Sequence, residues 1–286
     1  MRAMNRPPHD CGIVFGVCIA SIQSQDLRGR LEAIAVPLLA IAAEYDRRAA
    51  LAELYTFPVD LGGNADIAMG NVSKEELKKV YTQYMVAKGK PAREAYQAIL
   101  SLAPLGLCPL CGFNQAETLD HYLGKDKFPQ FSVLPLNLVP ACGSCNHGKR
   151  DTIAETAGQQ PLHPYYDHAH YISDQWLFAE VQQTSPATIR YYVNPPEAWD
   201  PISKERVESH FKGFNLSKKY SVQATSELSP IRYSLAHFCQ DEVSRKIRLR
   251  EHATTHFNLQ KNSWQTAFYQ ALSNSDWYCH SGFNSE

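Results

Sequence analysis

The chain has 286 residues, of which 44% are hydrophobic and 20% charged, and its formal net charge is -1. A chain of this length can bury a sizeable core and hold about one to three folded units. The balanced charge excludes a broadly basic nucleic-acid binder, so any nucleic acid must be bound through a local patch or with the help of a partner.

The cysteines and apolar runs indicate in which cellular compartment the protein works. No run approaches the ~20 apolar residues that a membrane span needs. The apolar run 12–22 could pass for the core of a signal peptide, but Pro7, Pro8 and Asp10 precede it and no small-residue cleavage site follows. Four cysteines stand outside any pairing pattern, which predicts a reducing, cytoplasmic location. They are Cys11, Cys18, Cys239 and Cys279.

The first hundred residues read as helical. Apolar residues recur at helical spacing over 27–54, with Pro37 as a break or kink. Ser73 and Glu76 form a capping-box pattern that opens a second helix, and Pro91 opens a third that leads to the first metal-type cysteine. A loop rich in Pro, Gly and Asn, 57–71, separates the first two.

Two Cys-x-x-Cys pairs follow, Cys108/Cys111 and Cys142/Cys145. Two such pairs can present four thiolates to one tetrahedral zinc ion. A closed shell of four sulfurs leaves no position for water, so this zinc is expected to be structural. The alternatives are two disulfides or four free thiols.

Polar residues suited to phosphodiester hydrolysis lie between and just after these pairs. His121 can accept a proton near neutral pH, and the oxygens of Asp120 and Asn146 suit a magnesium-like ion. Residues 132–134 read as a short strand and Cys142 opens a helix, which gives a strand, loop, strand, helix order. Asn137 is then expected in the connecting loop, where its amide can bond the backbone beside His121.

Residues 108–151 closely resemble the HNH endonucleases, also called the ββα-metal or His-Me finger fold, in their zinc-clipped form. The resemblance implies an α+β fold, a mainly helical chain around a central ββα-metal unit, with structural zinc and catalytic Mg²⁺ or Mn²⁺. Gly124 departs from the proline of many relatives. By the resemblance, His121 is the general base, Asp120 the adjacent metal ligand, Asn137 the middle asparagine and Asn146 the last motif position, with His147 as the alternative metal ligand.

A looser resemblance extends beyond this motif. The helical lead-in and the phrase His-Pro-Tyr-Tyr-Asp at 163–167 are similar to bacterial HNH proteins from anti-phage defence loci, including Septu-like systems. This implies an ATPase partner and DNA as substrate. Lys149, Arg150 and Lys125 would then be phosphate contacts. His163 and His170 fit no common metal-ligand spacing and are expected to pack against aromatic residues.

The rest of the chain reads as a hairpin and then helices. Residues 176–181 and 188–193 predict a hairpin that extends the catalytic sheet or packs beside it. Helices are expected from Ser203, over 231–260 and over 264–272, with Lys218 and Lys219 in a loop. Arg245 and Arg248 are candidate nucleic-acid contacts; the alternative is a solvated helix face balanced by Glu242 and Glu251.

These observations predict three regions: a helical region at 1–102, a zinc-clipped HNH nuclease domain with its hairpin at 103–195, and a helical region at 196–286. The expected function is metal-dependent endonuclease activity, on DNA above other substrates. Two alternatives stay open: a catalytically silent zinc-binding interaction module, and a stand-alone restriction or homing nuclease.

Overall fold

The computed structural model describes residues 1–148, 153–167 and 169–285. It is 53% helical and 10% strand, which agrees with the expected α+β class. The chain divides into two compact units, here called the N-terminal unit, Arg2–Tyr166, and the C-terminal unit, Asp167–Glu286 together with Met1. The boundaries expected at 102 and 195 do not coincide with this division.

The N-terminal unit begins with three helices, α1 (Cys11–Ala20), α2 (Gln25–Ala33) and α3 (Ala35–Ala50), and a short 3-10 helix, η1 (Leu54–Thr56). The helical pattern of 27–54 therefore belongs to two helices, and the break lies at Ile34 instead of at Pro37, where a break or kink was expected. Pro37 lies in the first turn of α3, where a missing backbone N–H breaks no helical hydrogen bond.

Two short strands and three helical segments follow: β1 (Ile67–Met69), β2 (Val72–Ser73), α4 (Lys74–Lys79), the π-helix η2 (Val80–Met85) and α5 (Arg93–Leu100). Both halves of the expected capping box are present, because Ser73 accepts from the Glu76 backbone N–H and the Glu76 carboxylate accepts from Ser73 N. β1 lies inside the stretch 57–71 that was expected to be an irregular loop, and β2 directly follows that stretch.

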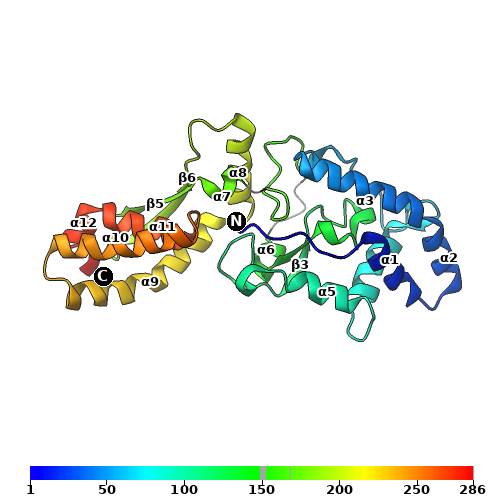
Figure 1. The fold of residues 1–286 in the computed structure, drawn as a ribbon, viewed down its shortest axis with the longest axis horizontal. Helices are drawn as coiled ribbons and strands as arrows, with labels where there is room; N and C mark the ends of the chain where they lie inside the picture. Colours follow the sequence, from blue (N-terminus) through cyan, green and yellow to red (C-terminus); the bar gives the residue numbers. More distant parts are fainter. Residues whose placement is uncertain (149–152, 168, 286) are drawn as a thin grey trace. The chain divides into compact units, whose positions relative to one another are not determined.

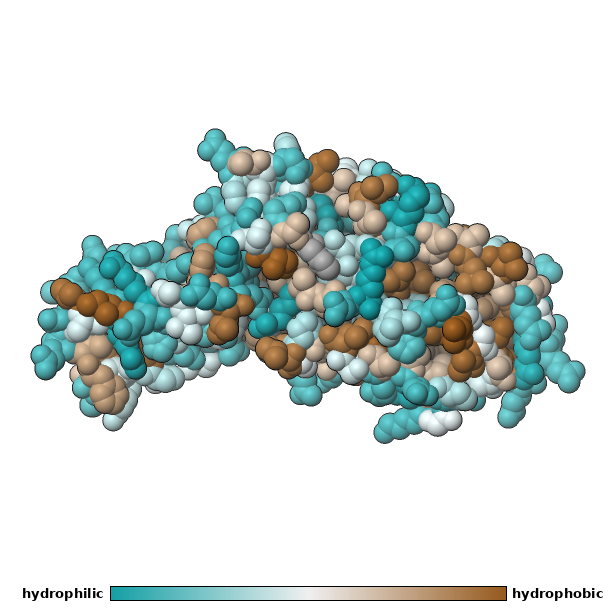
Figure 2. Space-filling model, in the orientation of Figure 1, coloured by the Kyte–Doolittle hydropathy of each residue, from teal (hydrophilic) through white to brown (hydrophobic). Residues whose placement is uncertain are grey.

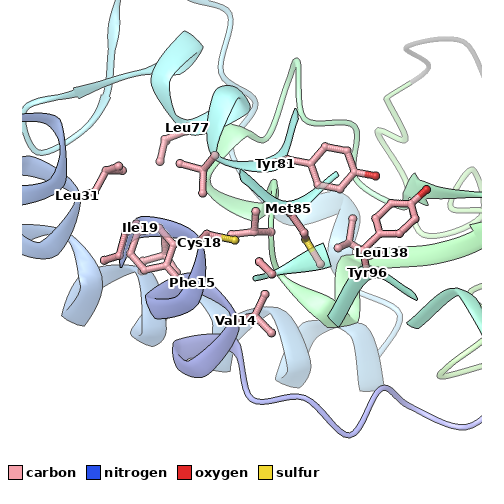
Figure 3. Close-up of a cluster of buried hydrophobic side chains, with 14 of the residues drawn as sticks. Val14, Phe15, Cys18, Ile19, Leu31, Leu77, Tyr81, Met85, Tyr96 and Leu138 are labelled. Carbon is pink, nitrogen blue, oxygen red and sulfur yellow. The ribbon is translucent and has the colours of Figure 1, made fainter. Parts of the chain in front are cut away.

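One hydrophobic core joins the helices to the hairpin that bears the candidate site. Figure 3 shows Leu138 in the same cluster as Val14 and Phe15 of α1. Leu119 belongs to this cluster too. The apolar run 12–22 is therefore largely core, and a boundary at 102 would cut through a shared core.

The hairpin consists of β3 (Thr118–His121) and β4 (Leu138–Ala141), which pair antiparallel with Asp120 opposite Val139. The helix α6 (Gly143–Asn146) follows directly, and 3-10 turns stand before and within this region at η3 (Pro104–Gly106), η4 (Pro129–Phe131) and η5 (Pro135–Asn137). The strand expected at 132–134 is wrong. Pro129 and Pro135 each open a 3-10 turn, and Ser132 and Val133 form a turn between them.

The C-terminal unit is built on a second hairpin, β5 (Leu177–Gln182) with β6 (Thr188–Val193), which confirms that element of the sequence analysis. The expectation that this hairpin extends the catalytic sheet was wrong, because β5 and β6 form a separate two-stranded sheet and belong with the C-terminal helices. The reason is packing, since α11 covers β5 and α9 covers β6 (Figure 1). The alternative, that the hairpin packs beside that sheet, stays a prediction.

The helices of this unit are α7 (His170–Ser173), α8 (Pro201–Gly213), α9 (Leu216–Phe238), α10 (Glu242–Leu259), α11 (Trp264–Asn274) and α12 (Asp276–His280), with a 3-10 turn η6 (Gly282–Asn284) at the end. Lys218 and Lys219 lie within α9, not in a loop. The stretch 231–260 is two helices, because Asp241 caps a new helix with its side chain.

The surface of the N-terminal unit carries exposed apolar side chains on α1 and α3, among them Ile13 and Val36. Figure 2 shows hydrophobic residues gathered where these helices lie. α1 is apolar on nearly all sides, so it cannot bury every side chain in one core. Within the described ranges, no helix is both long and apolar enough to cross a membrane.

Candidate functional site

The four metal-type cysteines come together in the N-terminal unit. Their Sγ atoms all lie within 4.8 Å of one another and the residues are buried. The Sγ atoms of Cys111 and Cys142 are 3.9 Å apart. Tetrahedral zinc with Zn–S bonds of about 2.3 Å places sulfurs about 3.8 Å apart, whereas a disulfide needs about 2 Å. The cluster therefore fits a zinc ion and not two disulfides.

Local turns present the sulfurs. Gly112 has a positive φ of 81° and its N–H donates to the Cys108 carbonyl, which closes the first knuckle. The Cys145 N–H donates to the Cys142 carbonyl in the second. The pKa of the Cys142 thiol is lowered because Cys108, Cys111 and Cys145 hydrogen-bond to its sulfur. The pKa of the Cys111 thiol is lowered as well, while those of Cys108 and Cys145 are raised, because the four sulfurs share hydrogen bonds. The cluster thus favours the thiolate form at Cys111 and Cys142.

His121 is the last residue of β3 and is buried. Its Nε2 lies 2.8 Å from the carbonyl oxygen of Ser132. A carbonyl oxygen can only accept, so Nε2 carries the proton, and in the neutral ring Nδ1 holds the lone pair. The fold therefore selects the tautomer in which Nδ1 is the basic atom.

Asp120 lies on β3 and Asn146 lies on α6. Asp120 precedes His121 on β3, and alternation along a strand places it on the same face as Thr118. The Asn146 amide lies 3.5 Å from the Thr118 hydroxyl oxygen, so α6 directs this side chain toward β3. Glu117 fixes the start of α6 by accepting from the Gly143 N–H at 3.1 Å.

His147, the alternative to Asn146, is exposed at the end of α6. Its Nδ1 lies 2.8 Å from the Gly143 carbonyl oxygen of its own helix. The contact with β3 is thus made by Asn146, while His147 bonds within α6.

Asn137 is fully buried at the end of η5. Its Oδ1 accepts from Leu123 N at 2.7 Å, and its Nδ2 donates to Leu123 O at 3.0 Å and to Phe131 O at 3.2 Å. The amide therefore bonds the backbone of the loop that follows His121, which is the contact expected from the sequence.

The candidate nucleic-acid contacts are scattered. Lys125 lies 5.9 Å from the centre of the Tyr81 ring, in the loop after His121. Lys149 and Arg150 lie outside the described residues. In the C-terminal unit, Arg245 donates to the Cys279 and His280 carbonyls. Arg248 is exposed, 3.8 Å from Glu251. Arg245 is thus used to hold the end of the chain in place.

Sequence reasoning missed Tyr81. Its ring meets the His121 ring edge-on, with centroids 4.4 Å apart, and its hydroxyl donates to the Leu119 carbonyl at 3.3 Å. Burial raises the pKa of Tyr81, and Tyr96 and the Asp120 carboxylate raise it further, so the phenol stays neutral. Tyr81 lies in the stretch after Ser73 that was expected to be helical, and a helical pattern gives no sign that a residue lies beside His121.

The chain is similar to the protein ea31 of Escherichia phage lambda. The two are 32% identical over 224 residues, which cover 73% of this chain and 75% of ea31. No family model matches the chain, and no solved structure matches it. The identity and coverage shared with ea31 show that the chain belongs to the family of this phage lambda protein.

Proposed function

We propose that this protein is a metal-dependent HNH endonuclease that hydrolyses phosphodiester bonds, with DNA as its substrate. One observation carries the proposal: the four-cysteine cluster, the β3–β4 hairpin and α6 form one local unit, with Asp120 and His121 at the end of β3 and Asn146 on α6. A zinc-binding module without catalysis would not need these three side chains beside the cluster.

His121 suits the role of general base. Its bond to the Ser132 carbonyl fixes the ring and leaves Nδ1 as the atom that can take a proton from water. Burial against Tyr81 prevents the ring from turning away from this position. Asn137 adds to this order by holding the following residues of the loop.

Asp120 and Asn146 are the residues that would hold Mg²⁺ or Mn²⁺. Both offer the oxygen ligands that such ions prefer, and the ion would supply charge neutralisation at the phosphate. The cysteine cluster would hold zinc with no open position, so the two metals have separate roles. Lys125, in the loop after His121, is suited to a phosphate oxygen.

A role in bacterial anti-phage defence, with an ATPase partner and a cytoplasmic location, belongs to the same proposal. It is supported by the sequence resemblance, and the near-neutral charge of -1 favours delivery by a partner over unaided DNA binding. A chain that cleaved DNA at full rate as a lone monomer would remove the reason for the partner.

The test is cleavage of supercoiled plasmid by the purified protein with Mg²⁺ or Mn²⁺, comparing the natural chain with His121→Ala. Loss of the base is expected to lower the rate by about 10²- to 10⁴-fold. His237→Ala is the matched control, since His237 is exposed on α9 in the other unit. Equal cleavage by the natural chain and His121→Ala would contradict the assignment. Transfer RNA in the same assay distinguishes DNA from RNA as substrate.

A further inference from the structure

We propose that Tyr45 and His163 form a buried hydrogen-bond chain that positions Asn137, and through it the loop behind His121. The inference rests on the proposed nuclease function, and it makes Tyr45 and His163 positioning residues for the hydrolysis. Neither residue belongs to the motif between the cysteines. Tyr45 comes from α3, and His163 lies beyond the second cysteine pair.

The hydrogen-bond chain ends at the Asn137 carboxamide, which makes as many hydrogen bonds as it can. The Asn137 carboxamide makes four hydrogen bonds: Oδ1 accepts from Leu123 N and from the Tyr45 hydroxyl, and Nδ2 donates to Leu123 O and Phe131 O. A carboxamide offers two donors and can accept two bonds at its oxygen. Its orientation is thereby fixed, and the Tyr45 hydroxyl at 3.1 Å is one of the four constraints.

The direction of each bond follows from the donors available. The Tyr165 backbone N–H donates to His163 Nδ1 at 3.2 Å, so that nitrogen holds the lone pair. The proton of the neutral ring is then on Nε2, which lies 3.3 Å from the Tyr45 hydroxyl oxygen and donates to it. The Tyr45 O–H is left to donate to Asn137. The chain thus runs one way, from Tyr165 N through His163 and Tyr45 to Asn137.

The chain is shielded from solvent. Tyr45 and Asn137 are 0% exposed and His163 is 1% exposed. The Tyr45 ring packs edge-on against Phe131 with centroids 5.0 Å apart, and the His163 ring lies 4.1 Å from that of Tyr122. With water excluded, a polar atom that loses its partner here stays unpaired, which makes each bond in the chain consequential.

The hydrogen-bond chain acts on His121 through the loop that directly follows this residue. Tyr122 N donates to the Asn137 carbonyl at 2.8 Å, and Leu123 bonds the Asn137 amide through both its N–H and its C=O. Tyr122 and Leu123 directly follow His121. A looser Asn137 therefore loosens the backbone that orients the His121 ring, and small errors in the orientation of a base lower the rate of the chemical step.

The first test compares Tyr45→Phe with Tyr166→Phe in plasmid cleavage with Mg²⁺. Each removes one phenolic hydroxyl from the same aromatic cluster, but the Tyr166 hydroxyl donates to Asp46 at 2.8 Å and lies outside the chain. Tyr45→Phe is expected to lower kcat about tenfold with KM unchanged, because partners that orient a reacting group act in this range. Tyr166→Phe is expected to keep kcat. Equal kcat for Tyr45→Phe and the natural chain would overturn the inference.

The second test asks whether a donor at position 163 is what matters. His163→Gln can still place an N–H near the Tyr45 hydroxyl, whereas His163→Leu cannot. The inference expects the Gln variant to recover most of the kcat that the Leu variant loses, at equal zinc content. Equal kcat in the two variants would show that His163 only fills space and would overturn the inference.

A third measurement does not depend on activity. Hydrogen exchange of the Leu123 amide, read by NMR, is expected to be at least about tenfold faster in Tyr45→Phe than in the natural chain or Tyr166→Phe, because the amide's acceptor is less fixed. Unchanged Leu123 exchange would overturn the positioning chain even for an active enzyme. If the natural chain cleaves no nucleic acid but Leu123 exchange is still faster in Tyr45→Phe, the result would refute the proposed function alone and leave the positioning role in place.

Discussion

At the scale of single residues, the candidate site separates two kinds of polar chemistry. Cys142 and its three partners form a closed sulfur cluster, while His121 and Asp120 stand on the neighbouring strand. Soft thiolates suit zinc and hard oxygens suit magnesium, so under the proposed function the two metals would bind at different places. Substitutions can therefore remove one function and leave the other.

His121→Ala is expected to leave a folded, zinc-containing protein that no longer cleaves, whereas Cys142→Ser is expected to lose zinc and melt the surrounding motif. Zinc binding in small motifs contributes about 10–16 kcal/mol of apparent free energy. The loss of zinc therefore accounts for most of the destabilisation expected in Cys142→Ser. Zinc content by metal analysis and unfolding by circular dichroism measure both variants. Equal zinc loss in the two would contradict separate roles.

Tyr81 is the residue whose place beside His121 only the structure revealed, and its ring is expected to matter more than its hydroxyl. Tyr81→Leu removes the edge-on contact and is expected to lower cleavage about tenfold through a less ordered base. Tyr81→Phe keeps the ring and should lose less. Tyr84→Leu is the control on the same π-helix. Identical rates for Tyr81→Leu and Tyr81→Phe would show that the ring contact is unimportant.

At the scale of elements, neighbouring helices pack through side chains spaced one helical turn apart. In the C-terminal unit, His252 and His256 of α10 both stack on Tyr269 of α11, with centroids 4.8 Å and 5.3 Å apart. Burial lowers the pKa of both histidines. The nearby Arg248 adds to this for His252, and His252 itself adds to it for His256. The packing of α10 on α11 therefore favours neutral imidazoles.

This packing predicts a pH dependence of stability. A folded-state pKa below the unfolded value means that the contribution of each histidine is complete above about pH 6.5 and is lost as the pH falls. The free energy of unfolding of the C-terminal unit should thus decrease from pH 7.5 to 5.5, as measured by urea denaturation. The double variant His252→Gln/His256→Gln should flatten this slope, while His237→Gln on α9 should retain it. A slope unchanged in the double variant would exclude these histidines as its cause.

At the scale of the whole molecule, the chain is two compact units, each with its own buried residues. The four-cysteine cluster belongs to the N-terminal unit alone. The shared core of α1, η2, β3 and β4 ties the helices before Cys108 to the hairpin, so the stability of those helices would also depend on a zinc ion bound at the cluster.

Removal of zinc by a chelator is therefore expected to act on one unit. Calorimetry should show two transitions in the natural protein, and the chelator should lower the temperature of the transition that belongs to the N-terminal unit. The transition of the C-terminal unit should stay in place, because the described residues of that unit contain no metal-type cluster. A matching shift of both transitions would contradict independent units.

The sequence by itself determined the features that depend on near neighbours in the chain. Cysteine spacing predicted the four-cysteine cluster, the Ser73 and Glu76 pair predicted a helix start, and two strand-like runs joined by a short loop predicted the β5–β6 hairpin, because each is a short-range pattern with a fixed geometry. The backbone contact of Asn137 was predicted for the same reason.

Only the tertiary structure decided which distant segments meet. It placed Tyr81 and Tyr45, from helices before Cys108, against His121 and Asn137, and it joined the second hairpin to the C-terminal helices. It also placed the second strand at Leu138–Ala141, where pairing with β3 and burial outweigh the local pattern of 132–134. Such contacts follow from how whole elements bury their apolar faces, which no window of neighbouring residues records.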